Sequence, residues 1–230
     1  MTGRPPKDDR VMLSAMVYVL RTGVPWRDLP RDYGPWASVY TRFRRWSRQG
    51  LFAQLLSALA QEAAGELRHL DCSCIKLHQH GANPPGGQAA QAMGRSRGGL
   101  NTKLAAVVDA RGRALAVALA PGQQHDQKAV RSLLPALRRG RVGGDKGFAT
   151  GAFYRRLQQQ GLRACLPPKA RERLTAPFHR GYYRLRHWVE NFFCRIKRFR
   201  RISTRYDKLA ETFLGFVQLA AIIDWLQNSV

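Results

Sequence analysis

Three carboxylates stand in the sequence where chemistry could use them. Asp71 lies in the alternating stretch LRHLDCSCIKL, Asp145 ends the short stretch RVGGD, and Glu190 lies in the basic segment YYRLRHWVENFFCRIKRFRR. In open α/β sheets, functional side chains gather at the carboxyl ends of strands. Sites rich in carboxylate oxygens suit Mg²⁺ or Mn²⁺, and two such ions about 4 Å apart can activate a nucleophile and stabilise a leaving oxygen on phosphorus. The three acids therefore predict a site for metal-assisted phosphoryl transfer.

The segment around Glu190, residues 182 to 201, surrounds this single acid with arginines and aromatic residues. Drawn as one helix at about 100° per residue, it presents a polar stripe of Tyr183, Arg186, Glu190 and Lys197, with the apolar side chains opposite. A carboxylate with one cation a turn before it and another two turns after it suits a phosphodiester substrate. The alternative is an ordinary Arg186–Glu190 pair on a solvated helix, worth about 0.2–0.5 kcal/mol.

The charge of the chain indicates a polyanionic partner. It holds 39 Lys and Arg against 15 Asp and Glu, for a net charge of +24. Nucleic acid is the commonest partner of so basic a folded domain, although ribosomal and membrane-surface proteins are also basic. No apolar run approaches the ~20 residues of a membrane span, and the first residues lack the apolar region of a secretory signal. The four cysteines form no disulfide framework, which favours a reducing cytosol.

Residues 8 to 62 are expected to form helices with short breaks, in a domain of residues 1–65. The stretch DDRVMLSAMVYVLRTG predicts a helix with an apolar face (Val11, Met12, Ala15, Val19) that ends at Gly23. A second helix is predicted over SVYTRFRRWSRQG, with Ser38 as N-cap and Val39, Phe43 and Trp46 on one face. Its arginines, Arg42, Arg45 and Arg48, lie away from that face. This is the layout of a helix-turn-helix DNA reader; the alternative is a small helical bundle with a solvated basic face.

From residue 66 onward the pattern changes to strands that alternate with helices, in a second domain of residues 66–230. The sequence predicts a strand around Asp71, a loop over 81–99, a hairpin from LNTKLAAVVD and ALAVALA, and strands at RVGGD and RACLP. Helices are expected at about 127–139, 151–160, 183–201 and 208–227. Such an order predicts a mixed α/β sheet with helices packed on it. In the first strand, Asp71, Ser73 and Ile75 share one face, and Cys72 and Cys74 lie on the other.

The spacing of Tyr183, Arg186, Glu190 and Lys197 resembles the Y-(2)-R-(3)-E-(6)-K signature of bacterial insertion-sequence transposases with a DDE catalytic triad. Other stretches resemble the group called IS-five-like, and together they cover nearly the whole chain: RTGVPWRDLPRDYGPWASVYTRFRRW, GRSRGGLNTK, PGQQHD, DKGF, LPPKAR and FRRISTRYDKLAETF. Two features depart from the family. Many members have a further helical segment before GRPPKDDR, so we expect end recognition to be affected more than catalysis. The first acidic motif commonly reads Asp-Ser-Thr and here reads DCSC.

The resemblance implies a ribonuclease-H-like catalytic domain in which Asp71, Asp145 and Glu190 bind two Mg²⁺, or Mn²⁺. The implied activity is cleavage of DNA at the terminal inverted repeats of an insertion sequence, followed by joining of the freed 3′-OH to target DNA. The implied partner is double-stranded DNA, bound by a homodimer or larger assembly in the nucleoid of a bacterial cytoplasm.

The residues predicted to contact DNA are basic or aromatic. The span from Arg180 to Lys208 holds ten Lys and Arg against two acids, a density that would repel itself without a polyanion. The predicted contacts are Tyr183, Arg186, Lys197, Arg200, Arg201 and Arg205 beside the site, Arg42, Arg45 and Arg48 for reading the inverted repeats, and Arg95 and Arg97 in the loop over 81–99. Contacts of Arg186 and Lys197 to phosphate would position the substrate without reading its sequence.

Other candidate residues have simpler interpretations. Cys72, Cys74, His78 and His80 could supply four zinc ligands, but their spacings are not those of ordinary zinc sites and the segment is better used as a strand. Asp126 is expected to cap the helix that follows it. Two rival functions remain: a metal-dependent nuclease of the same fold that cleaves without joining, and a catalytically defective or domesticated DNA-binding protein derived from such an element.

Overall fold

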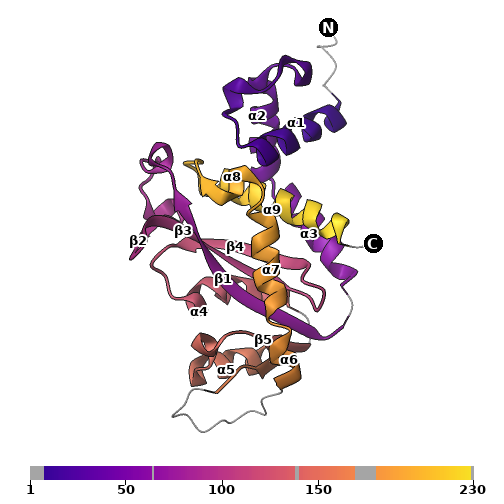
Figure 1. Cartoon of the computed structure of the whole chain (residues 1–230), viewed down its shortest axis with the longest axis vertical. Helices are drawn as coiled ribbons and strands as arrows, with labels where there is room; N and C mark the ends of the chain where they lie inside the picture. Colours follow the sequence, from indigo (N-terminus) through magenta and orange to yellow (C-terminus); the bar gives the residue numbers. More distant parts are fainter. Residues whose placement is uncertain (1–7, 64, 138–139, 169–179, 229–230) are drawn as a thin grey trace.

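The computed structural model describes residues 8–63, 65–137, 140–168 and 180–228. A mixed β-sheet carries helices on both of its faces, and the first two helices of the chain lie beyond one end of it (Figure 1). The prediction of a mixed α/β sheet preceded by helices is therefore confirmed. None of the described helices is both long and apolar enough to cross a membrane.

The helices of the N-terminal part are α1 (Asp9–Thr22), α2 (Trp36–Arg48) and α3 (Leu51–Gln61). Helix α1 begins at an aspartate cap, where Asp8 Oδ1 accepts a hydrogen bond from the Arg10 amide at 2.9 Å. It ends at Gly23, whose φ of 71° lets its amide close the last turn. Residues 24–35 then form a connector with two 3₁₀ turns, longer than the three- or four-residue turn of a helix-turn-helix. The helices were predicted correctly, but the link between α1 and α2 is not that of a simple helix-turn-helix.

Two details of these helices differ from the prediction. Val11 is 40% exposed instead of buried, because the buried stripe of α1 passes through Met12 and Met16. Helix α2 begins at Trp36, so Ser38 is an exposed residue within the helix and not its N-cap. Pro35, whose backbone is extended, takes the N-cap position, so the helix begins three residues earlier than predicted.

The sheet contains β1 (Leu67–Leu77), β2 (Gly94–Ser96), β3 (Gly99–Val108), β4 (Ala114–Pro121), β5 (Gly140–Gly143), β6 (Leu162–Cys165) and β7 (Thr204–Arg205). Strands β4, β3 and β1 are antiparallel neighbours, and β5 and β6 continue the sheet parallel to β1. The order β4-β3-β1-β5-β6 with these directions is that of a ribonuclease-H-like sheet. Strand β2 pairs with the start of β3, and β7 pairs with the end of β1. The predicted strands therefore all form, with β2 and β7 added to them.

The remaining helices are α4 (Asp126–Ala129), α5 (Gly151–Gln159), α6 (Arg180–Arg184), α7 (His187–Ile196), α8 (Arg200–Ser203) and α9 (Ala210–Gln227). One core cluster packs α1, α2, α3, α7 and α9 against the face of the sheet that carries Ile75 and Leu104. A second cluster packs α5 and the 3₁₀ helix Val130–Ala136 against the face that carries Leu70 and Val142. The sheet is thus the middle of three layers.

Helix α9 joins the N-terminal helices to the sheet. The rings of Phe43 on α2 and Phe216 on α9 stack with their centroids 4.3 Å apart. Buried residues of α3 and α9 belong to the same cluster as Leu104 in the sheet. The division into domains 1–65 and 66–230 remains a proposal, and the hydrophobic core is continuous across it.

The single helix expected over residues 183–201 is wrong. The chain forms α6, a turn, α7, a second turn and α8. At the first turn the Leu185 and Arg186 amides bond to carbonyls three residues earlier, and Arg198 and Phe199 do the same at the second. These tight bonds replace the i to i−4 bonds of a continuous helix. After the second turn, the Arg201 side chain points into the interior, where it forms an ion pair with the Asp207 carboxylate.

The helix expected over residues 127–139 is also shorter than predicted. The α-helical part is α4, and the chain continues as the 3₁₀ helix Val130–Ala136. Pro135 lies inside this segment and has no amide hydrogen to continue an α-helix. Residues 138–139 of the predicted helix, and residues 169–171 of the LPPKAR stretch, lie outside the described residues.

Candidate active site

Asp71 lies in the middle of β1, on the face that packs toward α7. Ile75 on the same face belongs to the core that includes α7, whereas Leu70 and Cys72 belong to the opposite core. The predicted division of this strand into two faces is therefore confirmed, and the cysteines of DCSC point away from Asp71. The Asp71 side chain is 20% exposed, and its Oδ1 accepts a hydrogen bond from the Cys72 amide at 2.8 Å.

Asp145 is brought beside Asp71 by the parallel register of β1 and β5. His69 pairs with Gly143 in this register, and each acid lies two residues further along its own chain. Asp145 then caps a 3₁₀ turn, because its Oδ1 accepts a hydrogen bond from the Gly147 amide at 2.9 Å. The two acids interact electrostatically across the gap where the strands part.

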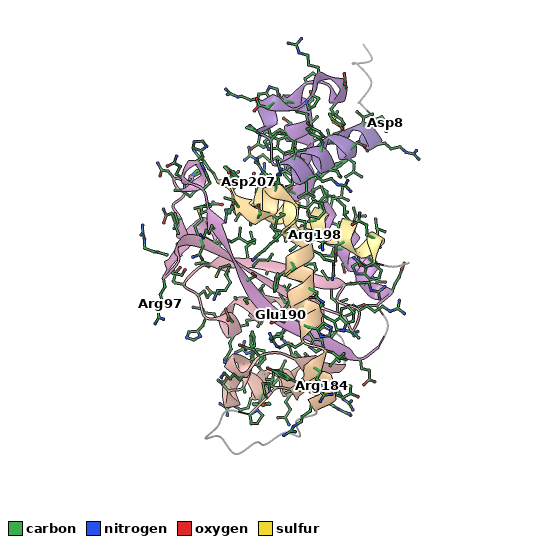
Figure 2. All side chains as sticks on the ribbon, in the orientation of Figure 1. Asp8, Arg97, Arg184, Glu190, Arg198 and Asp207 are labelled. Carbon is green, nitrogen blue, oxygen red and sulfur yellow. The ribbon has the colours of Figure 1, made fainter. Side chains whose placement is uncertain are left out.

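Arg186 connects the strand acid to the helix acid. Its Nη1 lies 3.6 Å from Asp71 Oδ2, and its Nη2 lies 2.6 Å from Glu190 Oε1. Its guanidinium carbon is 6.0 Å from the centre of the Tyr183 ring. Although the helix is interrupted at residues 185–186, Tyr183, Arg186 and Glu190 still lie together. The Arg186–Glu190 pair exists, yet it is not merely a solvated pair on one helix, since Arg186 also reaches β1. Figure 2 shows Glu190 in the lower part of α7, which lies over β1.

The electrostatics of the site favour the binding of a cation. The pKa of Asp71 is raised from 3.8 to about 6, mainly by burial and less by the charges of Asp145 and Asp126, against the opposing effects of the Cys72 amide and Arg186. Ionised Asp71 is thus incompletely compensated by the protein. A bound cation would relieve this deficit.

Carboxylates from β1, from the end of β5 and from α7 are the kind of oxygen donors that Mg²⁺ and Mn²⁺ prefer. Among the described residues, no three His, Cys, Asp or Glu side chains lie close enough together to hold a metal ion. Instead, the positive charge between Asp71 and Glu190 is that of Arg186. The residues fit a divalent metal in their chemistry, and Asp71 lacks full compensation for its charge. The predicted zinc alternative at Cys72, Cys74, His78 and His80 finds no support in this part of the chain.

Lys197 follows the last residue of α7 and reaches back to β1. Its Nζ donates to Ser73 Oγ at 2.6 Å and to the Cys74 carbonyl at 3.3 Å. Ser73 shares the face of Asp71, so the ammonium group is held two residues along the strand from that carboxylate. Lys197 thus reaches the strand that carries Asp71, although it caps α7 instead of continuing it.

Two groups near the site were not assigned to it from the sequence. His69 is fully buried, neither ring nitrogen has a hydrogen-bond partner, and burial lowers its pKa to about 4, helped by His187 and Arg186. Asp126 does not cap α4: His125 is the N-cap, and the Asp126 carboxylate instead accepts a hydrogen bond from Lys103. The position of His69, on the same face of β1 as Asp71, is the sequence signal that could have marked it.

The remaining predicted DNA contacts divide into exposed and buried arginines. Arg45, Arg48, Arg95, Arg97 and Arg200 are exposed, and Arg42 is mostly buried in an ion pair with Asp9. Figure 2 shows Arg97 at the edge of the molecule, away from Glu190.

The structure contradicts the DNA contacts predicted for Arg201 and Arg205. Arg201 is 6% exposed and makes two hydrogen bonds to the Asp207 carboxylate, at 2.9 and 3.0 Å. Arg205 is fully buried and donates to Thr102 Oγ1 at 2.6 Å and to the Asp207 carbonyl at 2.9 Å. Arg201 thereby joins α8 to the loop that follows β7, and Arg205 joins β7 to β3. Neither guanidinium group is exposed for contact with DNA.

A mixed sheet of this order, flanked by helices, defines a ribonuclease-H-like class of protein. Two family models match the chain: "Transposase DDE domain" over residues 64–225 and "Putative transposase of IS4/5 family" over residues 1–56. The chain belongs to the DDE transposase family. It is a transposase of the insertion-sequence type, as the sequence predicted.

One relative has a name that agrees with this family, and another is uncharacterised. The chain is 36% identical over 131 residues to the "Putative transposase for insertion sequence element IS6501" of Brucella ovis, covering 56% of this chain and all of that protein. It is 36% identical over 78 residues to an uncharacterised protein, y4sN, of Sinorhizobium fredii, covering 34% of this chain. The match spans 62% of the length of that relative.

The solved structures that match this chain have a lower sequence identity to it. The chain aligns with the pre-cleavage Mos1 transpososome at 15% identity and a TM-score of 0.31, over 99% of this chain and 80% of that one. It aligns with the catalytic domain of Mos1 mariner transposase at 14% identity and a TM-score of 0.31, over 81% and 91%. The family assignment rests on the family models and the Brucella relative.

Proposed function

We propose that this transposase cleaves DNA at the terminal inverted repeats of an insertion sequence and joins the freed 3′-OH to target DNA. The observation that carries the proposal is the bridge that Arg186 makes between Asp71 on the strand and Glu190 on the helix, with Asp145 near enough to raise the pKa of Asp71. Carboxylates that alternate with cations in this way suit an anionic substrate attacked at phosphorus.

The acids would hold the divalent metal. Asp71, Asp145 and Glu190 are the proposed ligands of two Mg²⁺, or Mn²⁺, and such ions supply Lewis-acid activation of a nucleophile and stabilisation of a leaving oxygen. For Asp71 to act as a ligand it must lose its proton, which its raised pKa delays to about 6.

The cations of the site would hold the substrate. Arg186 is placed to bind a phosphate once Asp71 and Glu190 have another cation to face, and its planar group suits two phosphate oxygens at once. Lys197, fixed on Ser73, would hold a phosphate beside the scissile one. Tyr183 would line the same path. Because the attacking group is a water or a 3′-OH, the mechanism requires no covalent link between protein and DNA.

The partner is proposed to be double-stranded DNA, bound by a homodimer or larger assembly because two element ends must be processed together. The net charge of +24 and the exposed arginines of α2 support the binding of DNA. Arg45 and Arg48 are the proposed contacts for the inverted repeats, and Arg95, Arg97 and Arg200 are further contacts.

The experiment is a cleavage and strand-transfer assay with Mg²⁺ on DNA that carries the element ends, comparing the wild type with Glu190→Gln. Cleavage and joining should vanish in the variant while DNA binding persists. The matched control is Glu62→Gln, which removes an exposed carboxylate at the end of α3 and should keep both activities.

Each rival function has its own result in this assay. A nuclease would cleave but would not join a pre-cut 3′-OH to target DNA. A defective or domesticated derivative would bind DNA and cleave in neither the wild type nor the control. Either result contradicts the proposal.

A further inference from the structure

A pocket of about 390 Å³ lies between the N-terminal helices and the segment that follows β7. Its walls come from three parts of the chain: the connector after α1, the start of α2, and residues 206–212. Figure 2 shows Asp207 of the last part where the sheet meets the N-terminal helices, well separated from Glu190. The pocket therefore lies outside the site formed by the three acids.

Aromatic rings line this pocket and remain open to solvent. Trp36 is 36% exposed and Tyr206 is 38% exposed, although large aromatic side chains usually bury their rings. Tyr40 lines the pocket beside them. The ring of His78 stacks on the ring of Tyr206, with the two ring centres 4.4 Å apart, and holds the tyrosine side chain in place.

Two cations flank the rings. The guanidinium of Arg27 lies 5.8 Å from the centre of the Trp36 ring, and Lys208, which also lines the pocket, is exposed. Among the described residues, no carboxylate forms an ion pair with either cation. Asp207, the acid in the lining, is already neutralised by Arg201. The pocket thus presents aromatic rings together with two cations that no carboxylate of the described residues pairs with.

We propose that this pocket binds an unpaired nucleobase of DNA, with Trp36 and Tyr206 stacking on the base and Arg27 and Lys208 binding the phosphates on either side. Every base has a face that can stack on an aromatic ring, and such stacking accompanies basic contacts in proteins that bind single strands. A base inside a duplex is already stacked on its neighbours, so the occupant must be single-stranded or locally unpaired. The inference rests on the proposed function, because it assumes that DNA is the substrate.

The position of the pocket fits a path along one DNA molecule. Tyr206 follows Arg205, which pairs with Leu77 at the end of β1. Leu77 lies six residues beyond Asp71, which at about 3.3 Å per residue is about 20 Å. This is the length of about six base pairs of B-form DNA. A DNA end held at Asp71 would therefore reach the pocket with a base about six positions away.

The test is fluorescence of a single-stranded oligonucleotide with one 2-aminopurine, compared with the same oligonucleotide in a duplex, titrated with the full chain. The base should be quenched on binding as a single strand. Trp36→Ala should weaken binding of the single strand about tenfold or more, and binding of the duplex by less than twofold. Trp36→Phe, which keeps a ring, should retain most of the affinity, and Tyr206→Ala should behave as Trp36→Ala does.

Leu55→Ala is the control, because Leu55 is 46% exposed on α3 and does not line the pocket. Equal losses for both forms of DNA, or no loss in Trp36→Ala and Tyr206→Ala, would overturn the nucleobase site. Such a result leaves the proposed function standing if Glu190→Gln still abolishes cleavage. Quenching that depends on Trp36, together with cleavage that does not depend on Glu190, would instead keep the site and reject the function. Binding of neither form of DNA overturns both.

Discussion

The guanidinium of Arg186 lies 2.6 Å from Glu190 Oε1, and the same group lies 3.6 Å from Asp71 on the central strand. An ion pair within one helix thus becomes a bridge between a helix and the sheet. The positive charge that the acids require is supplied by the chain itself. A divalent ion or a phosphodiester would compete for the partners of this one arginine.

Replacement of Arg186 should therefore make the folded protein depend more on divalent metal. We expect Arg186→Gln to lower the free energy of unfolding by up to about 1 kcal/mol, since the pair with Glu190 is partly exposed. For a domain of this size, that is about 2–4 °C in Tm. Added Mg²⁺ should raise the Tm of the variant more than that of the wild type, because the metal takes over the lost charge. Thermal unfolding with EDTA and with Mg²⁺ measures both effects.

The control for this prediction is Arg184→Gln, which removes an exposed arginine two positions away. It should leave the response to Mg²⁺ as in the wild type. Equal responses in all three proteins would show that Arg186 does not compensate the acids.

The raised pKa of Asp71 predicts how stability varies with pH in the absence of metal. The pKa of Asp71 is about 6 in the folded protein and 3.8 ordinarily. Between these two pH values, the folded state therefore keeps a proton that the unfolded chain has released. The stabilisation that it provides is present near pH 4 and is lost as the pH rises to about 6, up to about 3 kcal/mol. Asp71→Asn should remove this loss, so its stability relative to the wild type should grow between pH 4 and 7.

Urea unfolding in EDTA at several pH values measures that difference. The control is Asp32→Asn, which removes an exposed carboxylate, and the difference for Asp71→Asn should change with pH more than the difference for this control. A difference for Asp71→Asn that is flat, or that shrinks with rising pH, would contradict the burial of this carboxyl as the cause.

The buried arginines after α7 predict a loss of stability and not of DNA contact. Arg201→Met leaves the buried Asp207 carboxylate unpaired, which should cost about 3–5 kcal/mol in urea unfolding. Arg200→Met, at an exposed position, should change stability by less than about 0.5 kcal/mol and should weaken DNA binding. If Arg201→Met retained full stability and only weakened DNA binding, the interior role of Arg201 would be wrong.

The sheet could be predicted from the sequence because residues of β1 alternate between its two faces and because turn residues bound the strands. The faces of β1 followed from the same alternation, and they placed Asp71 correctly. The motif of Tyr183, Arg186, Glu190 and Lys197 was also predictable, since its spacing is local. The three acids could be proposed as one site because Asp71 lies in a strand, Asp145 follows one and Glu190 lies on a helix.

The remaining features could not be predicted because they depend on distant partners. The break after Lys197 brings Arg201 to Asp207 and Arg205 to Thr102, which is 103 residues away in the sequence. A basic segment looks the same whether its arginines face solvent or buried carboxylates. Asp126 is drawn from its expected cap by Lys103 on β3, a contact that local propensity does not contain.

The exposed arginines of α2 should determine the salt dependence of DNA binding. Arg45→Ala and Arg48→Ala should each reduce the slope of log affinity against log salt by about 1, because each phosphate contact releases about one counterion. Filter binding or fluorescence anisotropy at salt concentrations from about 50 to about 200 mM measures the slope. Arg42→Ala should change the slope less, since Arg42 already pairs with Asp9. Equal slopes in all variants would remove α2 from the DNA path.

The contact between Lys197 and Ser73 predicts that the two side chains act together. We expect Lys197→Met to reduce cleavage by about 100-fold, since loss of a phosphate-binding cation at such a site costs about 2–3 kcal/mol. Ser73→Ala should cost less, about 3- to 10-fold, because the ammonium keeps the Cys74 carbonyl at 3.3 Å. The effect should fall on the rate of the bound complex more than on DNA affinity, as for a group that holds the substrate in position. A double-mutant cycle tests the coupling: Ser73→Ala should have little further effect in the Lys197→Met background, and additive losses would show that the hydrogen bond between them does not orient Lys197 for catalysis.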